Sequence, residues 1–480
     1  MSMAREVAEL RLLNAELQRE NAELRAAVVL LQQRISELEE RLGKNSRNSS
    51  KPPSSDPPGT GRRTTKRVKG QRSRGGQVGR AGKTRPLLPA EQVDTLVDLV
   101  PDDCAFCGEG LAGTVDCGEL LRHQVTEIPP VKPEVTEYRQ HQRCCPKCHK
   151  VTTASLPAEA AASRFGPRLQ GIVGLLRGRF RLSHRDVPEA MEMLFGVEMG
   201  LGTTAGMQRR LAAALERPYD EAVDHVRRAA YRCADETSWR EGKANSWVWL
   251  AATDSVAVYK IQDGRGKAQA QALLGPDCVG VTVTDRYAAY HWLSESQHQY
   301  CWAHLLRDFE AMVERGGSSA WYGERLRSAA GRILAGWADW AAGRLSREQF
   351  LAQVTKDRKQ VKRMLDLAAA APAARKTRRI CAEILKHEAC LWVFLDHDLV
   401  PPTNNLAERL LRHTVLWRKG CFGTDSPDGS RFTERILTLI ASLRLQGRGR
   451  TILDALSQTY IAHARGLPPP SILPLAQAAS

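Results

Sequence analysis

The sequence has no uninterrupted apolar run long enough to cross a membrane as a helix, which would take about 18 residues. It also lacks the apolar core of a signal peptide, because its N-terminal segment is charged throughout. Both absences predict a cytoplasmic protein. Twelve cysteines are too few, in a chain of 480 residues, for the disulfide framework of a small secreted domain. Pairs spaced Cys-x-x-Cys therefore indicate metal binding instead.

Acidic residues are nearly absent between residues 43 and 90. This stretch holds thirteen basic residues against Asp56 alone, a net charge of +12 out of +16 for the whole chain. Such a density of positive charge releases counterions from a phosphate backbone and gives sequence-independent, salt-sensitive affinity. A composition this rich in Pro, Gly, Ser and Arg cannot bury a core, so we predict a flexible linker that binds DNA; a solvated linker with no partner is the alternative. The proposed DNA contacts are Arg62, Arg63, Lys66, Arg67, Lys69, Arg72 and Arg74.

Residues 1–42 carry a heptad pattern. Leucine recurs every seven residues, and the complementary core position is mostly aliphatic apart from Asn14 and Asn21. This pattern predicts a parallel coiled-coil homodimer in which the asparagines favour two strands. Pairs such as Glu20 with Arg25 have the spacing that attracts across such a dimer, whereas a single helix packed on its own protein would not need them. The repeating leucines are Leu10, Leu17, Leu24, Leu31 and Leu38.

Two Cys-x-x-Cys pairs lie within residues 91–157. Each pair can bring two thiolates to one tetrahedral Zn²⁺ ion, so the segment predicts a zinc ribbon, with ordinary buried thiols as the alternative. Alternating residues at 121–128 and 135–142 are expected to form its short strands. Whether the ribbon braces the fold or contacts DNA stays open. The expected ligands are Cys104, Cys107, Cys145 and Cys148, with Cys117, Cys144, His141 and His149 in reserve.

Residues 160–228 have helical periodicity. Helices are expected at 187–194 and 203–215, joined by a glycine-bearing turn. This arrangement is compatible with a helix-turn-helix that presents Gln208, Arg209 and Arg210 to DNA. A helical hairpin that only packs against the protein has the same pattern.

From residue 231 the pattern changes to strands. Three strands, a helix, a strand, and a further strand leading into a helix follow the order of a ribonuclease-H-like fold. We therefore predict a multidomain α/β protein with that catalytic core at 229–315 and 396–446. A helical insertion is expected at 316–395, and a helix and tail at 447–480.

Acidic residues end two of these strands. Asp235 and Asp285 should lie side by side, and a helix carrying Glu408 would bring a third carboxylate. Phosphoryl transfer commonly uses two divalent ions about 4 Å apart, and Mg²⁺ prefers carboxylate oxygens. A single acid at a strand end is often only a turn former. Weaker alternates are Glu236, Asp254 and Asp308, while His304 and Arg307 could contact the scissile phosphate or serve the fold.

Four motifs resemble those of transposases of the insertion sequence 66 family, and the resemblance extends over nearly the full chain. The motifs are Asp235-Glu-Thr, Thr284-Asp285-Arg-Tyr-Ala-Ala-Tyr, Cys301-Trp-Ala-His304 and Asn404-Asn-Leu-Ala-Glu408-Arg. The resemblance implies a DDE transposase whose Asp235, Asp285 and Glu408 bind Mg²⁺ or Mn²⁺. His304, Arg307 and Arg409 would support them. Arg286 departs from the small residue that the family often has.

The resemblance also implies the partners. They are the terminal inverted repeats of an insertion sequence, target DNA and accessory proteins of the same element, in a nucleoid-associated protein that does not bind membranes. Two alternatives remain on the sequence alone: a catalytically inactive DNA-binding remnant of the element, or a structure-specific nuclease without strand transfer.

Overall fold

The structure, a computed structural model, describes residues 17–20, 22–35, 38–39, 86–115, 117–118, 121–372 and 374–474. It divides into two units, Gly61–Pro133 and the remainder, and each is described by itself. Residues 17–20 and 22–35 are helical and exposed. Leu10, Asn14 and Asn21 of the expected zipper lie outside the described residues, as do the basic positions from Arg62 to Arg74. No described helix is long and apolar enough to span a membrane.

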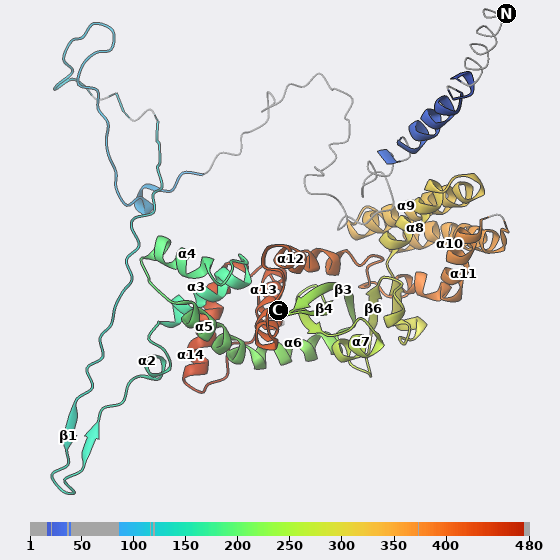
Figure 1. Ribbon diagram of the computed structural model, residues 1–480. Coiled ribbons are helices and arrows are strands. Elements are labelled where there is room, and N and C mark those ends of the chain that lie inside the picture. The colour runs from blue at the N-terminus through green and yellow to red at the C-terminus, as the bar shows by residue number, and fades with distance from the viewer. Residues whose placement is uncertain are drawn as a thin grey trace, which may run out of the picture. The chain divides into compact units, whose positions relative to one another are not determined.

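A five-stranded mixed sheet forms the centre of the larger unit (Figure 1). Its order is β5-β4-β3-β6-β7, with β4 antiparallel to β3 and β5, and with β6 and β7 parallel to β3. The turn between β3 and β4 contains Gly242, whose φ of 56° suits glycine. The strands are β3 (Tyr231–Glu241), β4 (Ala244–Ala252), β5 (Ala257–Gln262), β6 (Val281–Thr284) and β7 (His298–Tyr300).

Helices cover both faces of the sheet. In Figure 1, α12 (Asn405–Cys421) and α6 (Glu216–Arg228) lie on opposite sides of it. The crossover from β5 to β6 contains α7 (Lys267–Leu274), as the parallel pairing of β3 and β6 requires. The core is dominated by the strand residues from Val248 to Ala252, all of them fully buried.

The free edge of β5 is covered by α13 (Pro427–Leu445). Three α13 side chains, each four residues after the last, accept the outward backbone N–H groups of β5. Ser442 Oγ lies 3.1 Å from the Ala257 nitrogen, and Thr438 Oγ1 lies 3.1 Å from the Tyr259 nitrogen. Glu434 Oε1 accepts from Ile261. The helix thereby satisfies a strand edge that would otherwise be open to pairing.

A second, smaller apolar cluster lies among the helices before the sheet, centred on Val173, Val187 and Met207. The expected helical hairpin is present, but Gln208 is buried rather than presented to DNA, because it lies on the packed face of its helix. Arg210 is half-buried and donates to Gln170, so Arg209 alone of the three is exposed. The helices are α2 (Ala158–Ala162), α3 (Pro167–Gly178), α4 (Asp186–Phe195), α5 (Leu201–Ala214) and α14 (Ile452–Ala464).

The segment between β7 and α12 is helical. Its core contains Trp337, whose ring packs against Trp340, Phe350 and Phe394. Trp321 is the exception, because it is 43% exposed with the Arg325 guanidinium 3.8 Å above it. The helices are α8 (Trp302–Glu314), α9 (Gly317–Ala341), α10 (Arg347–Ala370) and α11 (Arg375–Lys386).

The prediction of strands at 121–128 and 135–142 in the zinc ribbon is mostly wrong. Residues 121–141 form no strand, and their apolar side chains, such as Val125 and Val135, are exposed. Alternation alone cannot hold a strand without a paired neighbour and a face to bury. The observed hairpin joins β1 (Gln142–Cys144) to β2 (Val151–Thr153). Short 3-10 turns complete the chain: η2 (Ala90–Gln92), η3 (Ala288–Tyr290), η4 (Glu295–Gln297), η5 (Glu388–Leu391), η6 (Val393–Leu395) and η7 (Gly449–Thr451).

Candidate active site

Asp235 and Asp285 lie on adjacent parallel strands. The register pairs Cys233 of β3 with Val283 of β6, so the two aspartates, each two residues further on, reach the same level of the sheet. The expected adjacency of these strands is confirmed. The expectation that Asp235 ends its strand is wrong, because β3 continues to Glu241 by pairing with β4, whereas β6 stops at Thr284. The long strand gives Asp235 a rigid backbone on both sides.

Glu408 lies in the first turn of α12, where the helix dipole favours a carboxylate. The start of this helix is held by Asn404, which is fully buried. The Asn404 Nδ2 donates to the Ala234 carbonyl at 2.8 Å, and its backbone N–H donates to the Cys301 Sγ at 3.1 Å. Asn404 therefore joins α12 to the strand residue before Asp235 and to the start of α8.

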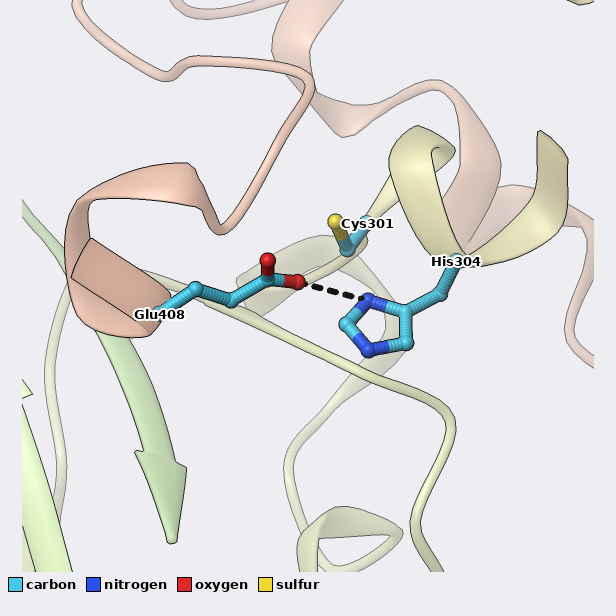
Figure 2. Close-up of side chains that lie close together, drawn as sticks. All are labelled: Cys301, His304 and Glu408. Carbon is cyan, nitrogen blue, oxygen red and sulfur yellow. Dashed lines mark ion pairs between the residues drawn. The ribbon is translucent and has the colours of Figure 1, made fainter. Parts of the chain in front are cut away.

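Two side chains of α8 point at Glu408. His304 Nδ1 lies 3.5 Å and Arg307 Nη2 lies 3.0 Å from Glu408 Oε1 (Figure 2 shows His304). Burial, followed by the positive charge of Arg307, lowers the pKa of His304 to about 3, so its imidazole is neutral. Cys301, His304 and Glu408 offer donor atoms within 4.8 Å of one another. Arg409, the third expected supporting residue, is exposed.

The carboxylates repel one another. Burial raises the pKa of Asp235 well above its ordinary value, and the charges of Glu236, Asp285 and Glu408 raise it further. The Glu408 charge is the smallest of these contributions, so it reaches Asp235, but among the described residues Asp235, Asp285 and Glu408 do not form a group whose donor atoms all lie within 4.8 Å of one another. A divalent cation would relieve this repulsion, and the hard oxygen donors fit Mg²⁺ or Mn²⁺.

Asp285 has a more mixed environment. Burial raises its pKa, while the Tyr287 backbone N–H, 2.9 Å from its Oδ1, lowers it. The guanidinium groups of Arg265, Arg286 and Arg307 also lower it. Positive charge therefore borders the carboxylates, as a site for a phosphate diester requires.

A supporting network lies behind the acids. The buried Glu236 carboxylate accepts from Tyr290 Oη at 2.6 Å and from Arg265 Nε at 2.8 Å. Arg265 in turn lies 3.9 Å above the Tyr287 ring. Because both Glu236 oxygens are occupied, this alternate acid supports the site. The sequence analysis missed Arg265 and Tyr290, since only the folded chain brings them together.

The other two alternate acids interact with other side chains. Asp308 forms an ion pair with Arg286, the residue at which this sequence departs from the resembling family. Asp254 interacts with Tyr231 at the start of β3. Neither is among the main causes of the raised pKa of Asp235, whereas Asp285 and Glu408 are.

The first cysteine pair lies in the Gly61–Pro133 unit. The Cys104 backbone N–H donates to the Glu109 carbonyl at 2.8 Å, and the Gly108 N–H donates to the Cys104 carbonyl at 2.9 Å. Gly108 has a φ of 75°, which closes the turn. Backbone N–H groups of Phe106 and Cys107 lower the pKa of the Cys104 thiol, which favours the thiolate that binds metal.

The second pair, in the larger unit, has the same design. The Cys145 N–H donates to the Lys150 carbonyl at 2.9 Å, and the His149 N–H donates to the Cys145 carbonyl at 2.9 Å. His149, with a φ of 55°, replaces the glycine. Backbone N–H groups of Cys148 and Lys147 lower the pKa of Cys145. The chemistry of each loop fits half of a tetrahedral thiolate site.

The sequence model of the Transposase IS66 family matches residues 184–431, more than half of the chain and all three carboxylates. A family of unknown function, DUF6444, matches residues 2–86. An uncharacterized protein, y4qI of Sinorhizobium fredii, is 25% identical over 437 residues, covering 83% of this chain and 77% of that protein. This chain belongs to the IS66 family of transposases.

Proposed function

We propose that this transposase cuts DNA at the terminal inverted repeats of its insertion sequence and joins the ends to target DNA. The family implies DNA as a partner. The observation that supports the chemistry is the placing of Asp235 and Asp285 at the same level of two paired strands, with the Glu408 charge acting on Asp235. On this proposal the sheet and its helices are a ribonuclease-H-like catalytic domain.

The three carboxylates would hold Mg²⁺ or Mn²⁺, which activates a water or 3′-hydroxyl nucleophile and stabilises the leaving oxygen. Asp235 and Asp285 come from paired strands, and Glu408 comes from a helix held by Asn404, so their spacing is set before DNA arrives. Arg307 places a permanent positive charge beside Glu408, where it can attract the scissile phosphate. His304, kept neutral by its lowered pKa, adds no charge at the same edge.

The outer segments would organise the DNA. The heptad segment would form a homodimer that brings two element ends together, and the basic linker would bind DNA of any sequence. The two cysteine loops, each with a thiol of lowered pKa, would hold Zn²⁺ and brace the chain between the linker and the catalytic domain. Accessory proteins of the same element would complete the assembly.

Cleavage and joining test the proposal directly. Labelled DNA carrying the element's terminal repeats is incubated with Mg²⁺ or Mn²⁺ and with wild type, Asp235→Asn, Asp285→Asn or Glu408→Gln. Asp277→Asn is the matched control, because this acid is exposed in the loop before β6. Wild type and the control should cut and join, and the three site variants should not.

The alternatives predict other products. Binding without nicking, with either metal and with partner proteins added, would make the chain a DNA-binding remnant. Nicking without joined products would make it a nuclease.

A further inference from the structure

The outer face of α12 carries a row of basic side chains. Arg409, Arg412, Leu416 and Lys419 are exposed and follow helical spacing, so they share one face. The opposite face, which includes Trp417, is buried on the sheet. The row begins directly after Glu408 and, at 1.5 Å per residue, extends about 15 Å along the helix.

A second group of arginines lies beside this row. Arg181 Nη1 is 3.1 Å from the Nδ1 of His413, which is itself on α12. Burial and then the charges of Arg181, Arg179 and Arg444 lower the pKa of His413 to about 4, with a hydrogen bond to Gly178 acting in the opposite direction. Burial, and then Arg444 and Arg181, also lower the pKa of Arg179. These arginines are close enough to repel one another.

In the part of the chain that the structure describes, neither group has an acidic partner. Among the described residues, no ion pair with a carboxylate is formed by Arg409, Arg412 or Lys419, nor by Arg179 or Arg444. On α6 the pattern is ordinary: Arg217 pairs with Glu221 at 3.0 Å, and Arg228 pairs with Asp224 at 3.7 Å. Unrelieved positive charge opposes folding, and a polyanion would remove that cost.

We propose that these six residues, the α12 basic surface, bind the phosphate backbone of DNA as it leaves the carboxylates. The surface consists of Arg179, Arg181, Arg409, Arg412, Lys419 and Arg444. This inference rests on the proposed function. If DNA is cut at the carboxylates, the duplex next to the cut can run along α12, because Glu408 lies in the first turn of that helix. Phosphate is the matching chemistry, since guanidinium groups donate to its oxygens in a planar fork. The contact is independent of base sequence.

Photo-cross-linking tests contact with DNA. Leu416, which is 45% exposed in the middle of the row, is replaced in the full-length chain by photoreactive benzoylphenylalanine. The control carries the same group at the exposed Asp224 of α6. Both proteins are irradiated with a labelled duplex of mixed sequence in the presence of a metal chelator. DNA should cross-link at position 416 and not at 224. Equal cross-linking at both, or none at 416 while the duplex is still bound, overturns the proposal.

Salt titration measures the charge contribution. The triple variant Arg409→Gln, Arg412→Gln, Lys419→Gln is compared with Arg217→Gln, Arg228→Gln, Arg344→Gln, whose arginines are all exposed and paired with acids. Fluorescence anisotropy gives affinity for the mixed duplex against salt. Each lost phosphate contact should reduce the log–log slope by about 0.9, so the first variant should lose about 2 to 3 units and the second almost none. Equal slopes overturn the proposal.

Failure of this surface is separable from failure of the catalytic proposal. Cross-linking is measured without metal and so needs no cleavage. If Asp235→Asn still cuts DNA but position 416 cross-links, the surface stands and the triad falls. If the triad variants lose cleavage and position 416 does not cross-link, the triad stands and DNA takes another path.

Discussion

The two sides of α12 carry opposite charge. Its inner edge brings Glu408 towards Asp235, whose pKa is raised by burial and by neighbouring carboxylates. Its outer face carries basic side chains that form no ion pair with a carboxylate in the described part of the chain. On α6, across the sheet, acids and arginines neutralise one another. Like charges accumulate where a ligand of the opposite sign can stabilise them, so on the two proposals above α12 would lie between the metal ions and the DNA.

Removing one acid from the inner edge should have the largest effect. Asp235→Asn should reduce the cleavage rate at least about 1000-fold, because it removes several kcal/mol of transition-state stabilisation through the metal ions. The same change should raise the thermal midpoint in chelator, since it removes a repelling carboxylate from a buried position. Cleavage kinetics and thermal melts with and without Mg²⁺ check both. A variant that loses activity and also melts lower in chelator contradicts the repulsion.

The second largest effect is expected from a change that weakens the attachment of α12 but keeps the three carboxylates. Asn404→Ala removes the Nδ2 donor to Ala234 and should reduce cleavage about 10- to 100-fold, the usual range for residues that support metal ligands. The Mg²⁺ concentration for half-maximal rate should rise, which a general loss of folding would not produce. Asn405→Ala, at the exposed neighbouring position, is the control. An unchanged Mg²⁺ requirement in Asn404→Ala would show that Asn404 does not position Glu408.

Glu434, on α13, has its pKa raised by burial at a place where we propose no metal ion. Burial raises the pKa of Glu434 to about 7 from its ordinary 4.5. The folded state therefore binds this proton more tightly than the unfolded state. Glu434 contributes about 3 kcal/mol to the free energy of unfolding below about pH 4.5, and this contribution is lost as the pH rises through about 7.

Glu434→Gln should abolish that loss while keeping an oxygen acceptor for the Ile261 N–H. Thermal midpoints of both proteins between pH 4.5 and 8 measure it. The difference between variant and wild type should grow up to about pH 7 and then level off, because the wild-type carboxyl is then fully ionised. A constant difference across this range refutes the interpretation.

A substitution on α6, whose charges are paired, should have the smallest effect on stability and on DNA affinity. Arg217→Gln breaks an exposed pair one turn apart and should change stability by less than about 1 kcal/mol, with no effect on DNA affinity. Chemical unfolding and anisotropy measure the two. A loss of affinity comparable to that of Arg412→Gln would remove the distinction between α6 and α12.

Local chemistry explains what could be predicted. Alternation and β-branched runs predicted the strands, and their order predicted that Asp235 and Asp285 would be neighbours, which the register of β3 and β6 confirms. The roles of Asp235, Asp285 and Glu408 stay predictions. The sequence pattern was insufficient where burial decides the structure. Gln208 was expected on the surface facing DNA and is buried, and residues 121–128 were expected to form a strand and form none.

The sequence by itself determined the family, the acids and the spacing that puts Arg409, Arg412 and Lys419 on one helix face, because motifs and helical periodicity are local properties. Only the tertiary structure decided which charged side chains have a partner and which do not. Arg265 contacts Glu236, 29 positions away in the chain, and Arg181 contacts His413, 232 positions away. Such contacts depend on how helices and strands pack, since electrostatic energy follows distance in space rather than along the chain.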